Sequence, residues 1–142
     1  MEVCKIFLSG GMSGLTQKQQ WAWRKEVEKE LTEFRYGTRV KPEFFNPCLY
    51  YNVDEDYHKT ENEHFEFDTY NLRRSDLIIV NFNAPNSIGS AMELMLAKEL
   101  RIPIIGLNEN KRKLHPWLEV CCNRICDDIE ELVDHVAACY LN

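Results

Sequence analysis

Residues Asp76–Arg101, with the sequence DLIIVNFNAPNSIGSAMELMLAKELR, decide the fold. The apolar run Leu77–Val80 is typical of a strand that is covered on both faces. The segment Asn83–Ser87 breaks this run, and an apolar helix that contains glycine and alanine follows and ends before Pro103. A buried strand followed by a short loop and a helix is the repeating unit of an α/β protein.

A carboxylate lies in the middle of the apolar face of this predicted helix. At 100° per residue, Glu93 falls within about 60° of four apolar or small residues, Gly89, Leu96, Ala97 and Leu100. An isolated buried charge is costly, and the first turns of such a helix lie at the sheet edge where open α/β sheets bind ligands. Glu93 is therefore the first candidate site residue. Two alternatives stay open: its side chain extends into solvent, or it forms a buried ion pair with Arg73 or Arg74.

The rest of the chain alternates strands and helices. Further strands are predicted over Val3–Leu8, Thr38–Phe45, Ile102–Leu107 and Val120–Cys126, and further helices over Gln17–Phe34, Asn62–Arg74 and Asp127–Tyr140. We expect one domain, residues 1–142, of the doubly wound (flavodoxin/Rossmann-like) α/β class. Its five-stranded, mostly parallel sheet would have helices on both faces.

Several local features refine this prediction. Thr16 is expected to cap the first long helix, whose core residues would be Trp21, Val27, Leu31 and Phe34, while Trp23 and Arg24 could reach the preceding loop. Residues 48–60 are acidic and rich in tyrosine, which is typical of either a functional lid or a solvated loop. His115-Pro116-Trp117 is expected to form a rigid corner.

Composition excludes several classes of function. The net charge of -6 argues against nucleic acid as a partner. No apolar stretch is long enough to span a bilayer and no signal peptide is recognisable, so we expect no membrane partner. The six cysteines form no C-x-x-C pair, which favours reduced, buried thiols in a cytoplasmic protein. No His/Cys cluster has zinc-ligand spacing, so neither a metal nor a cofactor is expected.

The candidate active site lies where three predicted strands end. It combines the small-residue loop Ser9–Gly14, the acid Asp68, the loop Asn83–Ser87 and Glu93. The small-residue loop can bring backbone N–H groups to a phosphate or sugar, although a plain tight turn explains it equally well. One carboxylate can act as nucleophile or base while a second acid supplies a proton. Such a pair suits glycosyl transfer through an oxocarbenium-like transition state.

A resemblance to a known family adds detail to this reading. It rests on KIFLSGGMSG (5–14), Asn46-Pro47, Asp68, SDLIIVNF (75–82) and above all NSIGSAMELMLAKELRIPIIGL (86–107). With these motifs the chain resembles the nucleoside 2-deoxyribosyltransferase family. That family includes transferases that exchange the bases of nucleosides, and related hydrolases that cut the N-glycosidic bond of nucleoside 5′-monophosphates.

The resemblance implies roles for particular residues. Glu93 matches the glutamate that attacks C1′ and forms a glycosyl-enzyme, and Asp68 matches the acid that assists the base. Ser87 lies where transferases acting on unphosphorylated nucleosides tend to have an aspartate, and where the hydrolases have serine. Candidate substrate-binding residues are Ser9, Gly10, Gly11, Ser13, Asn83, Ser87 and Gly89. Of these, Ser9, Gly11 and Ser13 match the phosphate-binding positions of the hydrolases. The loop at 9–14 lacks the arginine expected beside a phosphate.

The resemblance also implies an assembly and a set of small-molecule partners. We expect a homodimer or a higher homo-oligomer, in which His115 either contributes to a neighbouring subunit's pocket or is an ordinary corner residue. The partners would be a nucleoside or nucleotide and a free base. Transfer to another base, transfer to water, and a non-catalytic nucleotide-binding module are the readings that stay open.

Overall fold

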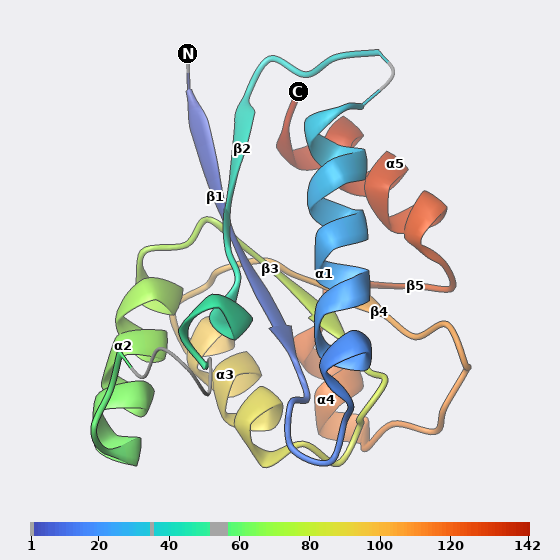
Figure 1. Ribbon diagram of the computed structural model, residues 1–142. Coiled ribbons are helices and arrows are strands. Elements are labelled where there is room, and N and C mark those ends of the chain that lie inside the picture. The colour runs from blue at the N-terminus through green and yellow to red at the C-terminus, as the bar shows by residue number, and fades with distance from the viewer. Residues whose placement is uncertain (1, 35, 52–56) are drawn as a thin grey trace.

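Five parallel strands form one sheet in the order β2-β1-β3-β4-β5 in the computed structural model, which describes residues 2–34, 36–51 and 57–142 (Figure 1). The strands are β1 (Val3–Gly10), β2 (Lys41–Phe45), β3 (Leu77–Asn81), β4 (Ile104–Leu107) and β5 (Arg124–Cys126). This order is that of the flavodoxin-like doubly wound folds. The predicted fold class is therefore confirmed, with a sheet that is parallel throughout.

Helices cover both faces of the sheet (Figure 1). They are α1 (Gln17–Thr32), α2 (Glu61–Arg73), α3 (Ile88–Glu99), α4 (Pro116–Cys121) and α5 (Ile129–Tyr140), with a short 3-10 helix, η1 (Pro47–Tyr50), after β2. Helices α1 and α5 pack in one apolar core, and α2, α3 and α4 pack in the other. The five predicted strands and the four predicted long helices are all present.

The central strand β3 explains why both faces need a cover. All five of its residues are buried. Because successive side chains of a strand point to opposite faces, Leu77 and Ile79 enter the core beneath α1 and α5, whereas Ile78 and Val80 enter the core beneath α2 and α3. An uninterrupted apolar run is thus what a strand between two helical layers requires.

The first long helix begins as expected but buries different residues. Thr16 caps it, and its side chain accepts a hydrogen bond from the Gln19 backbone in a capping box. The prediction that Trp21 belongs to the core is wrong, because Trp21 is only half-buried and Lys25 lies over its ring. Trp23 and Arg24 occupy the buried stripe instead, together with Val27 and Leu31.

The end of the chain differs most from the prediction. Val120 was expected in a strand, but it belongs to the short helix α4, and β5 begins only at Arg124. His115 caps this helix through Nδ1, which accepts a hydrogen bond from the Trp117 backbone. Pro116 at the first helical position favours the helix further, so His115-Pro116-Trp117 starts a helix rather than a simple corner.

Two further expectations concern loops and thiols. Residues 47–50 of the tyrosine-rich segment form η1, and residues 52–56 lie outside the described part of the chain. All six cysteines are free, as predicted, but only three of them are buried: Cys121 and Cys122 are half-buried and Cys139 is exposed. No helix among the described residues is both long and apolar enough to cross a membrane.

Candidate active site

The candidate site lies at the switch point of the sheet, where β1 and β3 end side by side. The last residues of these strands, Gly10 and Asn81, are paired in the sheet register. The chain leaves β1 toward α1 on one face and leaves β3 toward α3 on the other. Crevices at this point are where doubly wound sheets bind their ligands.

Glu93 of α3 is hydrogen-bonded to the end of β1 rather than extended into solvent. Its side chain is half-buried, and Ser9 Oγ donates a hydrogen bond to Glu93 Oε1 at 3.1 Å. Among the described residues neither Arg73 nor Arg74 forms an ion pair with it; both are exposed, and Arg74 lies over the Tyr70 ring. Both structural alternatives for Glu93 are therefore wrong.

The electrostatic surroundings of Glu93 strongly favour its protonated form. The pKa of Glu93 is raised to about 8, mainly by burial and also by the nearby carboxylate of Asp68, whereas the hydrogen bond from Ser9 and the charge of Arg24 oppose the rise. A glutamate with such a pKa in a crevice is typical of a functional group.

Asp68, on α2, is the second carboxylate of the site. Tyr51 Oη donates a hydrogen bond of 2.9 Å to Asp68 Oδ2, while Asp68 Oδ1 is buried with no hydrogen-bond partner among the described residues. Burial raises the pKa of Asp68; Tyr51, His64, His58 and Arg24 act against that rise. The unpaired Oδ1 is an atom from which Asp68 can donate or accept a proton.

Tyr51 is a site residue to which the sequence assigned no individual role. Its ring stacks on His64 with 4.4 Å between the ring centroids, and burial together with Asp68 raises the pKa of its hydroxyl. The hydroxyl therefore stays protonated and acts as a donor to Asp68. The cluster of tyrosines after Pro47 was the available signal, but it could not tell which ring reaches the acid.

Two glycines let the loop after β1 lie close to its neighbours. A Cβ at Gly11 would be 2.5 Å from the Ala84 Cβ, so only glycine allows the β1–α1 loop to contact the β3–α3 loop this closely. Gly14 has a φ of +78°, which an L side chain rarely adopts. The predicted loops at residues 9–14 and 83–87 are thus brought together.

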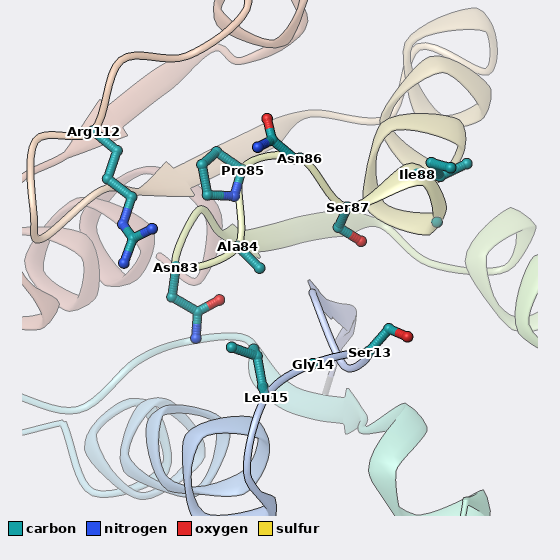
Figure 2. A pocket seen from close by; sticks show the side chains of 11 residues that line it. Ser13, Gly14, Leu15, Asn83, Ala84, Pro85, Asn86, Ser87, Ile88 and Arg112 are labelled. Carbon is teal, nitrogen blue, oxygen red and sulfur yellow. The ribbon is translucent and has the colours of Figure 1, made fainter.

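A cleft of about 620 Å³ opens between these two loops. Figure 2 shows residues 83–88 on one side, residues 13–15 on the other, and Arg112 approaching from the segment between β4 and α4. The lining residues are Ser13, Gly14, Leu15, Asn83, Ala84, Pro85, Asn86, Ser87, Ile88, Gly89 and Arg112. Of the predicted substrate-binding residues, Ser13, Asn83, Ser87 and Gly89 line this cleft.

The remaining predicted residues lie beside the cleft or away from it. Glu93 and Asp68 are not among the residues that line the cleft, and neither are Ser9, Gly10 and Gly11. Ser9 connects β1 to Glu93 through its hydrogen bond. His115 is exposed at the start of α4, and it too is absent from the lining. Its contribution to a neighbouring subunit stays a prediction.

Arg112 is the second residue that sequence reasoning missed. It lines the cleft together with Ser13 and Ser87, and its guanidinium has no hydrogen-bond or ion-pair partner in the described part of the chain. Ser87 caps α3, and the first residues of that helix also line the cleft, so a helix N-terminus, whose first N–H groups have no intrahelical acceptor, lies at the cleft. The basic run at 111–113 was visible in the sequence, but its position relative to the β1–α1 loop depends on the fold.

Comparisons with known proteins identify this fold. No protein-family model and no curated protein matches the chain. A solved conserved protein from Enterococcus faecalis V583 is 15% identical, with a TM-score of 0.75 over 94% of this chain and 97% of that chain. A 2-deoxyribosyltransferase from Bacillus psychrosaccharolyticus is 14% identical, with a TM-score of 0.73 over 92% and 91% of the two chains.

A third solved structure is a nucleotide-cleaving enzyme. A CMP N-glycosidase from Clostridium botulinum is 18% identical, with a TM-score of 0.55 over 93% of this chain and 97% of that chain. At such identities the likeness shows a shared fold. It is the fold that the resemblance in the sequence implies.

Proposed function

We propose that this chain cleaves the N-glycosidic bond of a (deoxy)nucleoside or of its 5′-monophosphate, with Glu93 as the nucleophile. The observation that carries the proposal is the pair of carboxylates, Glu93 and Asp68, at the switch point of a sheet. That fold is shared with a 2-deoxyribosyltransferase and with a CMP N-glycosidase. Two neighbouring carboxyl groups are the usual means of cleaving a glycosidic bond.

The proposed reaction has two displacement steps. A Glu93 carboxylate oxygen bonds to C1′ as the C1′–N bond breaks; the bonding pair leaves with the base, and Asp68 gives its proton to that base. The sugar is then held as an ester of Glu93. An incoming base or a water molecule attacks C1′ in the second step, gives a proton to Asp68 and frees the Glu93 carboxylate.

The electrostatics of the free protein favour the proton on Glu93, so the proposed reaction requires that proton to pass to Asp68 before Glu93 attacks. Because burial and the charge of Asp68 raise the pKa of Glu93, the two groups together retain one proton near neutral pH. The chemistry requires that proton on Asp68, where Oδ1 has no hydrogen-bond partner in the part of the chain that the structure describes. The hydrogen bond from Ser9 favours the ionised form of Glu93 and so favours this arrangement.

One observation favours a phosphorylated substrate. The loop at 9–14 has no arginine, but Arg112 lines the same cleft as Ser13 and Ser87. A guanidinium together with hydroxyl groups and a helix N-terminus suits a phosphate group. We therefore favour nucleoside 5′-monophosphates over unphosphorylated nucleosides as substrates. The assay described below identifies the acceptor of the sugar, which is either a second base or water.

The exposed apolar side chains of α3 and α4 support an oligomer. Residues Met92 and Met95 of α3 and Trp117 and Val120 of α4 are more than half exposed, and the two helices pack against each other. An exposed apolar surface on contacting helices is typical of an interface. We infer a homodimer or higher homo-oligomer, and light scattering of the purified protein gives the number of subunits.

The function is tested with a panel of deoxynucleosides and their 5′-monophosphates, with and without a free base, followed by chromatography. New nucleosides that form only with added base indicate a transferase. Free base released from monophosphates alone indicates a hydrolase. Ligand binding without any base release would contradict the proposal and indicate a non-catalytic nucleotide-binding module.

A further inference from the structure

Arg24 of α1 is a buried cation that the proposed reaction does not use. Its exposed fraction is 0%, although arginine is almost never fully buried unless paired. Among the described residues it forms no ion pair. Its four hydrogen bonds go to the backbone carbonyls of Leu8, Gly10 and Gln20 and to the Cys48 sulfur.

Two of these hydrogen bonds enclose the residue that contacts Glu93. Arg24 Nε donates to the Leu8 carbonyl at 3.3 Å, and Nη2 donates to the Gly10 carbonyl at 3.2 Å. Ser9 lies between these two carbonyls, and its hydroxyl donates to Glu93 Oε1. A planar guanidinium that binds the carbonyls on both sides of one residue restrains the backbone from which that side chain projects.

The surrounding residues are shaped to admit this guanidinium. A Cβ at Gly10 would lie 3.2 Å from Arg24 Nη2 and 2.9 Å from the Trp23 ring. The other end of the guanidinium is held by Gln20, whose carbonyl accepts from Nη1 at 2.6 Å, and by Cys48 of η1. Arg24 thus links α1, the end of β1 and η1 at a single point beneath the site.

We propose that Arg24 is a positioning residue of the active site: it fixes the Ser9 hydroxyl against Glu93 and supplies a buried positive charge to the Glu93–Asp68 pair. The inference rests on the proposed function, since it assigns Arg24 to the same nucleophile. Arg24 contacts neither substrate nor the reacting atoms and acts through Ser9 and through its charge.

The ionisable groups around Glu93 make the effect of this charge predictable. The charge of Asp68, on α2, raises the pKa of Glu93, and both carboxylates raise the pKa of Tyr51, in the segment after η1. Cys48 is hydrogen-bonded to Arg24. His64 and His58 lower the pKa of Asp68. Arg24 is the cation that lowers the pKa of Glu93. Removing its charge should therefore raise that pKa and shift the ionisation of the nucleophile to higher pH.

The test uses Arg24→Gln, Arg24→Lys and the exposed control Arg39→Gln, each compared with the parent protein. Infrared titration of the free protein, with the Glu93→Gln spectrum subtracted, follows the ionisation of Glu93 without any substrate. We expect Arg24→Gln to shift this titration upward by about one pH unit, which is about tenfold in the ionised fraction at neutral pH. Arg24→Lys keeps the charge, so it should shift the titration much less.

Kinetics separate the geometric part of the role from the charge. Lysine cannot bind both carbonyls as a fork, so Arg24→Lys should lower kcat about tenfold with little change in KM. In a Ser9→Ala background the same substitution should have a much smaller effect, because the coupled residues act as one unit. If Arg24 had only a structural role, the effects of Arg24→Lys and Ser9→Ala on kcat would be additive.

The outcomes distinguish this inference from the proposed function. Arg24→Lys serves as the test if Arg24→Gln does not fold. An unchanged Glu93 titration in folded Arg24→Gln would overturn the role of Arg24 even if the enzyme is active. Where Arg24→Gln does not fold, additive effects of Arg24→Lys and Ser9→Ala on kcat would overturn it. A shifted titration in a protein that cleaves no substrate of the panel would support the positioning role and contradict the proposed function.

Discussion

Charged side chains are arranged in opposite ways at two places in this molecule. At the switch point, Glu93, Asp68 and Arg24 are buried or half-buried, and no ion pair joins them in the described part of the chain. Beside β5, Arg124 and Glu131 form an exposed ion pair at 3.1 Å. Surface pairs of this kind contribute little to stability, whereas unpaired buried charges are costly. The cost at the switch point therefore points to function.

The largest effect is expected from removing the nucleophile. Glu93→Gln keeps the shape and the hydrogen bond to Ser9 but cannot form a glycosyl ester, so kcat for base release should fall by about 10³-fold or more. Glu99→Gln, at an exposed position of the same helix, is the matched control and should leave kcat unchanged. Equal losses in both variants would indicate damage to α3 rather than loss of a nucleophile.

Removing the proton donor should have the next largest effect. Asp68→Asn retains the hydrogen bond from Tyr51 to the side-chain oxygen but cannot donate a proton to the base, so we expect kcat to fall by about 10²- to 10⁴-fold. Substrates with good leaving groups should lose less. Exposed Glu66, also on α2, gives the control variant Glu66→Gln, and a leaving-group-independent loss in Asp68→Asn would exclude the acid role.

The same glutamate should make the fold less stable as pH rises. The pKa of Glu93 is about 8 in the folded protein and near 4.5 when unfolded, so the folded state binds more protons between these values. In that window the free energy of unfolding should fall by about 1.4 kcal/mol per pH unit from this group.

Denaturant melts at pH 5 and pH 8 measure this dependence. Glu93→Gln should flatten the pH dependence between those values and make the variant more stable than the parent protein at pH 8. An identical dependence in both proteins would mean that Glu93 ionises freely in the folded state.

A smaller effect is expected at the rim of the cleft. Arg112→Gln should raise KM for a nucleoside 5′-monophosphate about 10- to 100-fold, the value of a charged hydrogen bond, and leave cleavage of the unphosphorylated nucleoside unchanged. Lys113→Gln removes an exposed charge from the same segment outside the cleft lining. A similar rise in both variants would indicate a general effect of charge, with no phosphate contact at Arg112.

The smallest effect belongs to the exposed pair. Arg124→Gln breaks the hydrogen bond to Glu131 Oε1, yet the thermal midpoint and kcat should both stay within experimental error because solvent screens the pair. A clear loss of activity in this variant would show that the exposed pair also matters for function, and would contradict the distinction drawn between it and the switch point.

The sequence predicted the fold well because its strongest signals are local. Residues Leu77–Asn81 are apolar or buried throughout, and Thr16 followed by Gln19 is a capping box that needs no distant partner. The same central stretch carried the prediction for Glu93, since a carboxylate on an apolar helical face can be located from the period of the helix alone.

The sequence failed where tertiary contacts decide. Trp21 and Trp23 are both compatible with an amphipathic helix, and only packing under β1 selects Trp23. Helix α4 is too short to show a period. Tyr51 and Arg112 come from segments far from Glu93 in the chain, and nothing local in the sequence indicates that they meet the site.

Mass spectrometry of the quenched reaction tests the central claim most directly. Protein mixed with a deoxynucleoside 5′-monophosphate and quenched in acid should carry the mass of one sugar phosphate on the peptide that contains Glu93. The Glu93→Gln protein should carry none and release no base. Base release that persists in the Glu93→Gln protein would contradict the account.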